Sequence, residues 1–132
     1  MIEAEIVQLL AEDAPVLALV ARRVYPLVLP QGTTLPAVTY QRISGIHEKL
    51  LAEPAALTRP RFQFVAHAST FLQARQVTNA VKAALNGRRA ARSSTNIQSI
   101  SVENEFDHYN PAQPDMAATW SSYLDLVIWH TT

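Results

Sequence analysis

The stretch RFQFVAHASTFLQARQVTNAVKAALNG, residues 61–87, decides the fold class because its hydrophobic period changes partway along. In its first part apolar and polar side chains alternate, which predicts a half-buried strand over 60–68. The apolar face of this strand carries Phe62, Phe64, Ala66 and Ala68. From residue 70 the apolar spacing becomes helical, so the stretch predicts a strand that leads directly into a helix.

The helix predicted over 70–86 has the strongest signals of any helix in the chain. Thr70 and Gln73 form a T-x-x-Q capping box at its start, and Asn86-Gly87 supplies the stop. One stripe of the helix is apolar and consists of Phe71, Ala74, Val77, Val81, Ala84 and Leu85. We expect this stripe to pack on the sheet.

The other elements follow from the same two periods. The pattern predicts a helix over 2–12 and a second over 13–23, which Asp13 caps and in which Pro15 lies in the first turn. Further strands are predicted over 37–44, 97–106 and 120–129. A short extended segment over 24–29 is kept at the sheet edge or outside the sheet by its prolines.

The connections complete the predicted architecture. They are a long loop or hairpin arm over 46–60, a basic polar loop over 88–96 and a turn-rich loop over 110–116. The strands mostly follow one another without crossover helices, which is typical of an α+β fold. We therefore expect a single domain over 1–132, with an antiparallel or mixed β-sheet of about four strands and two to three helices packed on one face.

Two of the predicted strands raise the question of what covers the sheet. Over 97–106 we expect Ile100, Val102 and Phe106 to point inward. The strand over 120–129 has large residues on both faces: Leu124, Leu126 and Ile128 on one, Tyr123, Val127 and Trp129 on the other. The second face needs a cover, which is either the chain's own N-terminal helices or a protein partner.

Composition limits the possible functions. Eleven basic residues balance eleven acidic ones, while 48% of the residues are hydrophobic and 17% charged. A neutral, rather apolar small protein tends to associate, and the lack of a basic excess argues against a dedicated nucleic-acid binder. The absence of cysteine excludes disulfides and cysteine-based zinc sites. No apolar run approaches the ~20 residues that span a bilayer, and the acidic start MIEAEIVQLL is unlike a signal peptide, so we expect cytoplasmic synthesis.

Two charged clusters are the candidates for chemistry. Glu103, Glu105 and Asp107 alternate along a predicted strand and precede His108, which suggests either a hard-cation site or a solvated strand face. The second cluster consists of Arg88, Arg89 and Arg92. These arginines either contact phosphate groups or are cations that stabilise the C-terminus of the preceding helix. No nucleophile motif or glycine-rich phosphate loop occurs, so we predict no catalytic, metal or cofactor-binding residue.

Four motifs follow one another along the first two thirds of the chain. They are Arg23-Val24-Tyr25-Pro26, Leu35-Pro36-Ala37-Val38-Thr39-Tyr40-Gln41-Arg42-Ile43-Ser44-Gly45, Arg61-Phe62-Gln63-Phe64, and the helix from Thr70 to Leu85. In order and spacing they resemble the small tail completion, or tail terminator, proteins of long-tailed bacteriophages. The resemblance covers 1–87 by motif and the rest by strand order, and 88–118 fits no motif of the family.

The resemblance implies a small α+β domain that forms a hexameric ring on the end of the finished tail tube. Such a ring stops tube polymerisation and joins the tail to the connector or stopper protein on the head side. The implied location is the head-proximal end of the tail in a phage, prophage or gene transfer particle made in a bacterial cytoplasm. Members are not enzymes, need no cofactor and no membrane, and let DNA pass through the lumen without sequence-specific binding.

Within such a ring, we expect the loops 25–37 and 46–59 to make the subunit or axial contacts. The expected contact residues are Tyr25, Pro26, Leu29, Pro30, Leu35, Glu48, Lys49, Leu50 and Leu51, and those expected to face the lumen and its DNA are Arg88, Arg89 and Arg92. The alternatives are another head–tail connector protein (an adaptor or stopper), a small metal-dependent enzyme and a nucleic-acid-binding module. The enzyme alternative would be built around Glu103, Glu105 and His108.

Overall fold

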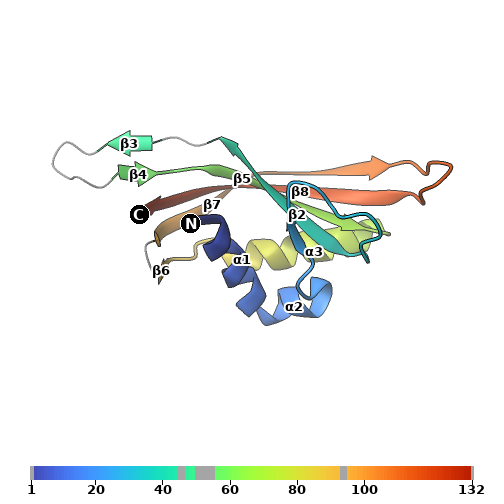
Figure 1. Cartoon of the computed structure of the whole chain (residues 1–132), viewed down its shortest axis with the longest axis horizontal. Coiled ribbons are helices and arrows are strands. Elements are labelled where there is room, and N and C mark those ends of the chain that lie inside the picture. Colours follow the sequence, from blue (N-terminus) through green and yellow to red (C-terminus); the bar gives the residue numbers. More distant parts are fainter. Residues whose placement is uncertain (1, 45–46, 50–55, 93–94, 132) are drawn as a thin grey trace.

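Three helices lie on one face of a twisted sheet, as the computed structural model shows (Figure 1). The structure describes residues 2–44, 47–49, 56–92 and 95–131. Along the chain the elements are α1 (Ile2–Glu12), α2 (Ala14–Val20), β1 (Val24–Pro26), β2 (Ala37–Ser44), β3 (His47–Lys49), β4 (Ala56–Thr58), β5 (Arg61–Ala68), α3 (Phe71–Leu85), β6 (Ala90–Arg92), β7 (Thr95–Asn110) and β8 (Thr119–Thr131). The predicted α+β class is confirmed.

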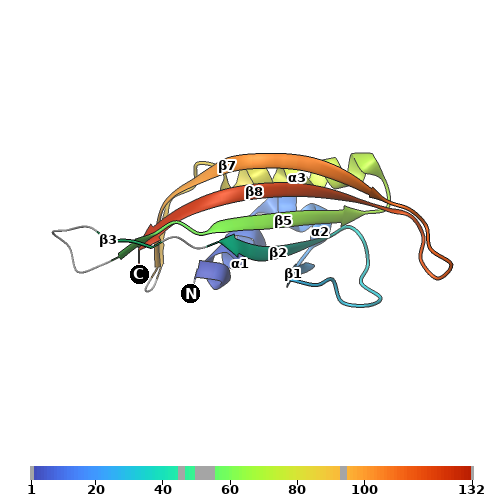
Figure 2. The ribbon, with the colours of Figure 1, turned by 90° about the horizontal axis from the view of Figure 1, so that it is seen from above.

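The main part of the sheet has the strand order β1–β2–β5–β8–β7 (Figure 2). β1 runs parallel to β2, whereas the other pairs are antiparallel, so the sheet is mixed. β3 and β4 pair with each other beyond β2 and β5, and β4 also pairs with the end of β8. The predicted set of about four strands corresponds to β2, β5, β7 and β8, to which the structure adds short segments.

α3 forms where its capping signals predict. The Thr70 hydroxyl accepts a hydrogen bond from the backbone N–H of Gln73, while the Gln73 side chain accepts one from Ser69 N–H instead of Thr70 N–H. At the other end Gly87 adopts a φ of 75°, a left-handed conformation that glycine adopts without strain. The helix is therefore fixed at both ends by the residues that mark it in the sequence.

The core lies between the helix layer and one face of the sheet. Alternate residues of β5 and β8 supply its sheet side, as the period-2 pattern predicts, and α1, α2 and α3 supply the other side. The largest side chains that are fully buried there are Phe62, Phe64, Ile6, Leu9, Leu10, Leu85, Ile100, Leu124, Leu126 and Ile128. The chain's own helices thus cover only the face that carries Leu124, Leu126 and Ile128.

A β-bulge in β7 overturns one predicted orientation. The register shifts between Val102 and Asn104, so the alternation of side chains reverses there. Val102 pairs with the core residue Leu126, whereas Phe106 pairs with Tyr123 on the opposite face and is 43% exposed. The prediction that Phe106 points inward is wrong for this reason. The segment 88–96, predicted as a loop, also contains β6, which pairs with the start of β7.

We predict that Leu85→Ala lowers the free energy of unfolding by about 2–5 kcal/mol, because the side chain is fully buried under the sheet. Leu72→Ala is the matched control, since it makes the same change in the same helix at a side chain that is 67% exposed. This control should alter stability by about 0.5 kcal/mol or less. Urea unfolding measures both, and equal losses would contradict the placement of the core.

Candidate interaction surfaces

The face of the sheet that no described helix covers carries a row of hydrogen-bonded polar side chains. Asp125 accepts from Arg61 at 2.9 Å and from Gln63 at 3.1 Å, although its own side chain is almost fully buried. Thr39 and His67 are hydrogen-bonded at 3.0 Å across the β2–β5 pair. Because the partners sit on neighbouring strands, the row links β2, β5 and β8 and gives the buried Asp125 carboxylate the partners that it needs.

The large residues of β8 on this uncovered face are shielded by neighbouring side chains. Phe106 stacks on Tyr123 with ring centroids 4.4 Å apart, and the Arg59 guanidinium lies 5.2 Å from the centre of the Trp129 ring. Val127 is 9% exposed between them. Of the two alternatives for the cover of this face, the N-terminal helices are the wrong one, because α1 and α2 pack with α3 on the opposite face.

An open groove of about 300 Å³ lies beside the polar row. Its lining residues are Leu27, Thr39, Tyr40, Gln41, Gln63, Val65, His67 and Tyr123. Burial lowers the pKa of His67, so the ring favours its neutral form there. Two pairs of its polar side chains are hydrogen-bonded to each other, Thr39 with His67 and Gln41 with Gln63, and the lining includes no carboxylate.

The proline-rich loop between β1 and β2 presents apolar side chains to solvent. Leu27 and Val28 are 68% and 74% exposed, and Leu27 adopts a left-handed φ of 62°. The backbone N–H of Leu27 donates to the Tyr40 carbonyl at 2.8 Å, and at the far end Arg23 Nε donates to the Pro36 carbonyl at 3.0 Å. The loop is thus tied to the sheet at both ends while its apolar side chains point outward.

The carboxylates of β7 are engaged by basic residues of α3. Arg75 contacts both Glu105 and Asp107 at 3.3 Å, and Lys82 Nζ lies 3.1 Å from Glu105. Burial alone would raise the pKa of Glu105, but hydrogen bonds from Lys82 and Arg75 hold it below its ordinary value. Among the described residues no cluster of three or more histidine or carboxylate side chains could hold a metal ion.

This ion-pair network is neither the hard-cation site nor the solvated strand face that the sequence suggested for the three carboxylates of β7. Glu105 and Asp107 do share a face, but that face is turned toward α3, since Glu105 pairs with the core residue Leu124. Glu103 lies at the bulge and is exposed. The predicted row of three carboxylates is therefore broken after its first member, and two of the three fasten β7 to the helix layer.

The structure places the other predicted contact residues in separate regions. Tyr25 and Pro26 lie in β1, and Leu29, Pro30 and Leu35 lie in the loop that follows. Glu48 and Lys49 form part of β3, whose side chains are outside the description, and Leu50 and Leu51 lie outside the described residues. Arg88 and Arg89 are exposed after α3, and Arg92 ends β6.

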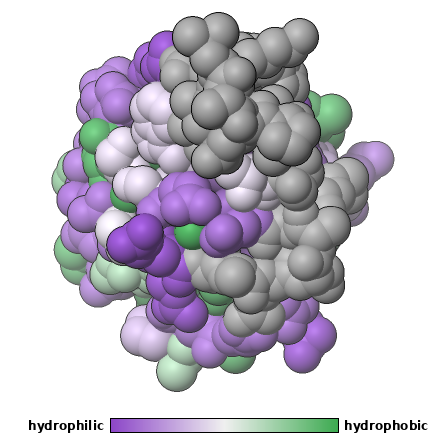
Figure 3. All heavy atoms as spheres, turned by 90° about the vertical axis from the view of Figure 1, so that its left-hand side faces the viewer, coloured by the Kyte–Doolittle hydropathy of each residue, from purple (hydrophilic) through white to green (hydrophobic). Residues whose placement is uncertain are grey.

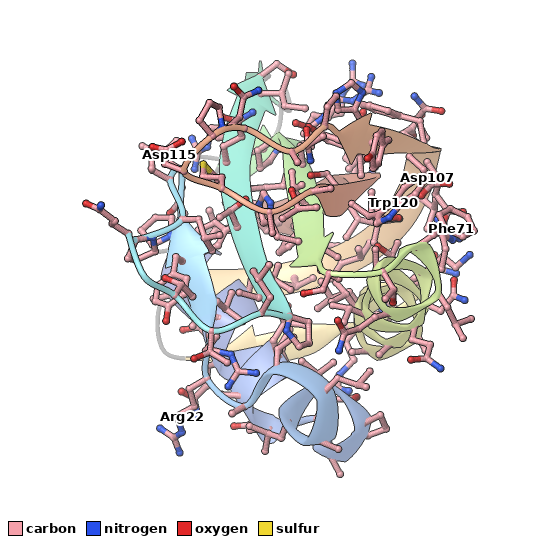
Figure 4. The ribbon with its side chains drawn as sticks, turned by 90° about the vertical axis from the view of Figure 1, so that its right-hand side faces the viewer. Arg22, Phe71, Asp107, Asp115 and Trp120 are labelled. Carbon is pink, nitrogen blue, oxygen red and sulfur yellow. The ribbon has the colours of Figure 1, made fainter. Side chains whose placement is uncertain are left out.

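Sequence reasoning missed an aromatic cluster at the start of α3. Trp120 lies 5.5 Å from Phe71 and 4.7 Å from Tyr109, measured between ring centroids, and Figure 4 shows Phe71 and Trp120 side by side. Phe71 and Tyr109 are nearly half exposed. The sequence did contain a sign of this cluster. Tyr109 and Trp120 stand on either side of the turn-rich loop, and in the β7–β8 hairpin they form a cross-strand pair.

A family model described as "Tail completion protein gp17" matches residues 4–130. The chain belongs to this family. The tail completion match extends over 88–118, where no motif was recognised, and confirms the resemblance seen in the motifs between Arg23 and Leu85. As a member, the chain is a structural protein of phage-type tails. None of its described helices has the length and apolar character required to cross a membrane.

A chain from a solved structure titled "Virion of native gene transfer agent (GTA) particle" has the same fold as this tail completion protein. The two superpose with a TM-score of 0.72 over 96% of this chain and 92% of that chain. Their sequences are 19% identical, so the likeness concerns the fold alone. No curated protein matches the chain significantly.

We predict that Arg75→Ala lowers the free energy of unfolding by about 1–2 kcal/mol, because it leaves Asp107 and one side of Glu105 without their cation. Arg22→Ala is the control, since Arg22 is exposed and makes no ion pair within the described chain. The difference between the two variants should shrink in about 1 M salt. Chemical unfolding at two salt concentrations measures it, and equal stabilities at low salt would contradict the role of the network.

Proposed function

We propose that this tail completion protein forms a hexameric ring that caps the finished tail tube of a long-tailed phage, prophage or gene transfer particle. In that position the ring stops tube polymerisation and joins the tail to the connector or stopper protein of the head. The observation that carries the proposal is the tail completion family match over residues 4–130. The fold likeness to a chain of a gene transfer agent virion supports it.

The surfaces of the subunit suit a protein that acts by assembly. A ring subunit needs two different exposed surfaces that complement each other, because each copy contacts one neighbour on either side. The chain exposes apolar side chains both on the loop after β1 and around the start of α3, for example Val28 and Leu72. Apolar residues that water reaches in a monomer become favourable contacts once a partner covers them.

The proposal includes no catalytic step, cofactor or metal. The carboxylates best placed for chemistry, Glu105 and Asp107, are already bonded to Arg75 and Lys82. Arg88 and Arg89 are exposed, and we assign them, with Arg92, to the lumen that DNA crosses. Contacts of this kind with phosphates are independent of base sequence.

An adaptor or stopper ring of the connector is the second candidate, and particles that lack the protein distinguish the two. Without a tail completion ring, we expect tails that are overlong or fail to join heads, as seen by electron microscopy. Without an adaptor or stopper, tails of normal length would accumulate beside heads that leak DNA. Normal infectious particles in the absence of the protein would contradict both.

We predict that Leu29→Ser combined with Pro30→Gly weakens ring assembly by about tenfold or more while subunit stability changes by about 1 kcal/mol or less. Pro30 is exposed and Leu29 partly so, and the loop keeps its backbone bonds from Leu27 and Thr33. The middle of the loop becomes more flexible in this variant and would have to order on binding, which costs affinity. Native mass spectrometry measures how much of the protein forms rings, and urea unfolding measures the stability of the subunit.

The matched control for this pair is Met116→Ser with Pro114→Gly, which makes the same two kinds of change in the other proline-rich loop. We expect the control to leave ring assembly between subunits unchanged. Intact rings from the Leu29 and Pro30 variant at unchanged subunit stability would argue against a contact role for the loop after β1.

A further inference from the structure

Seven of the eight exposed large apolar side chains of the described chain lie at opposite edges of the sheet, and the eighth, Met116, lies in the loop between β7 and β8. Leu27, Val28 and Ile43 belong to the β1–β2 edge, and with the exposed Arg22 they form what we name the β1 edge surface. At the other edge is the β7 edge surface, which consists of Phe71, Leu72, Glu103, Phe106, Asp107 and Tyr109. Strand order separates the two surfaces by β2, β5 and β8.

The two surfaces differ in charge. Arg22 has no ion pair within the described residues, and neither has Glu103. Arg75 and Lys82 pair with Glu105 and Asp107 of β7, so Glu103 is the carboxylate of this strand that remains unpaired within the described chain. Figure 4 shows Arg22 on the opposite side of the molecule from Asp107 and Phe71. One edge is thus apolar and positive and the other apolar and negative.

The arginines that follow α3 lie beside the start of β7, away from Phe71 and Tyr109 of the β7 edge surface. α3 has 15 residues and rises about 1.5 Å per residue, so Arg88 lies on the order of 20 Å along the helix from Phe71. Phe71 begins that helix, and Tyr109 lies close to it through their shared contact with Trp120. The end of the molecule that faces the viewer in Figure 3 is mostly hydrophilic where it is described, so apolar residues do not gather there as they do at the edges.

The hydrogen bonding of the backbone also indicates that the β7 edge contacts another chain. β6 pairs with only the first residues of β7, and the N–H of Gly87 donates to the carbonyl of Ile100. From Ser101 to Asn110 no strand of the described chain pairs with the outer side of β7. A long edge strand of this kind tends to be covered by another chain or protected. β1, in contrast, has three residues and ends in Pro26, which lacks an N–H.

We propose that the β1 edge surface of one copy packs against the β7 edge surface of the next copy. This inference rests on the proposed ring and names the surfaces that build it. A second copy is the occupant because a single chain carries both halves of a contact that is apolar on each side and opposite in charge. A two-fold dimer would instead place Arg22 near Arg22 or Glu103 near Glu103, which like charges disfavour.

Cysteine pairs test the arrangement, since the chain has no cysteine of its own. One chain carries Val28→Cys and the other Leu72→Cys, at side chains that are 74% and 67% exposed. After mixing and treatment with a short bismaleimide, we expect a product that joins the two variants and little that joins either to itself. A chain with both substitutions should give a series of crosslinked oligomers, of which the largest has the number of subunits in the ring. Ala4→Cys, exposed on α1, is the control and should join to neither.

Native mass spectrometry and electron microscopy, in solution and on particles, report separately whether rings form. Rings together with the mixed product support the inference. Rings in which Val28→Cys joins only to itself, or joins to nothing, overturn the inference and leave the proposed function standing. Absence of rings both in solution and on particles overturns the proposed function and the inference with it.

Charge reversal supplies a second measurement. Arg22→Glu and Glu103→Arg should each raise the dissociation constant for subunit association about threefold to tenfold, because each places like charges across the contact. Both substitutions in one chain should bring the constant back to within about twofold of the original. A double variant that associates more weakly than either single variant would overturn the pairing of these two edges.

Discussion

The sheet of this protein can bury only one face by itself, because α1, α2 and α3 all pack on the same side. That one-sided layer fixes which residues of each strand become core and which remain near water. On the uncovered face the chain uses hydrogen bonds between side chains, such as those of Asp125 with Arg61 and Gln63, to hold polar groups in place. Most of the exposed large apolar residues then lie at the edges of the sheet.

Local periodicity predicts most of the helices and long strands. The alternation over 61–68 and the capping box at Thr70 act within a few residues, so they are visible in the sequence and reappear in β5 and α3. The division of β8 into a core face and a second face is equally local, since successive side chains alternate. These signals depend on burial and backbone geometry and need no knowledge of distant partners.

Features that depend on distant residues are not visible in this way. The bulge at Val102–Asn104 reverses the alternation of β7, so Phe106 turns outward and Glu105 turns toward Lys82. The short strands β4 and β6 lie beside the end of β8 and the start of β7, and β3 pairs with β4, while the sequences of the three carry no strand pattern of their own. The cluster of Phe71, Tyr109 and Trp120 likewise joins three elements that only the folded chain brings together.

The central position of β8 has a consequence for synthesis. β8 follows every other described element along the chain, yet it lies between β5 and β7, which do not pair with each other. A nascent chain that has reached residue 118 contains both neighbours of the central strand and nothing to join them. Both then present open backbone edges that favour pairing with other molecules. Completion of the sheet must therefore wait for the 13 residues of β8 to leave the ribosome, and an early stop there would yield an incomplete sheet that is prone to aggregate.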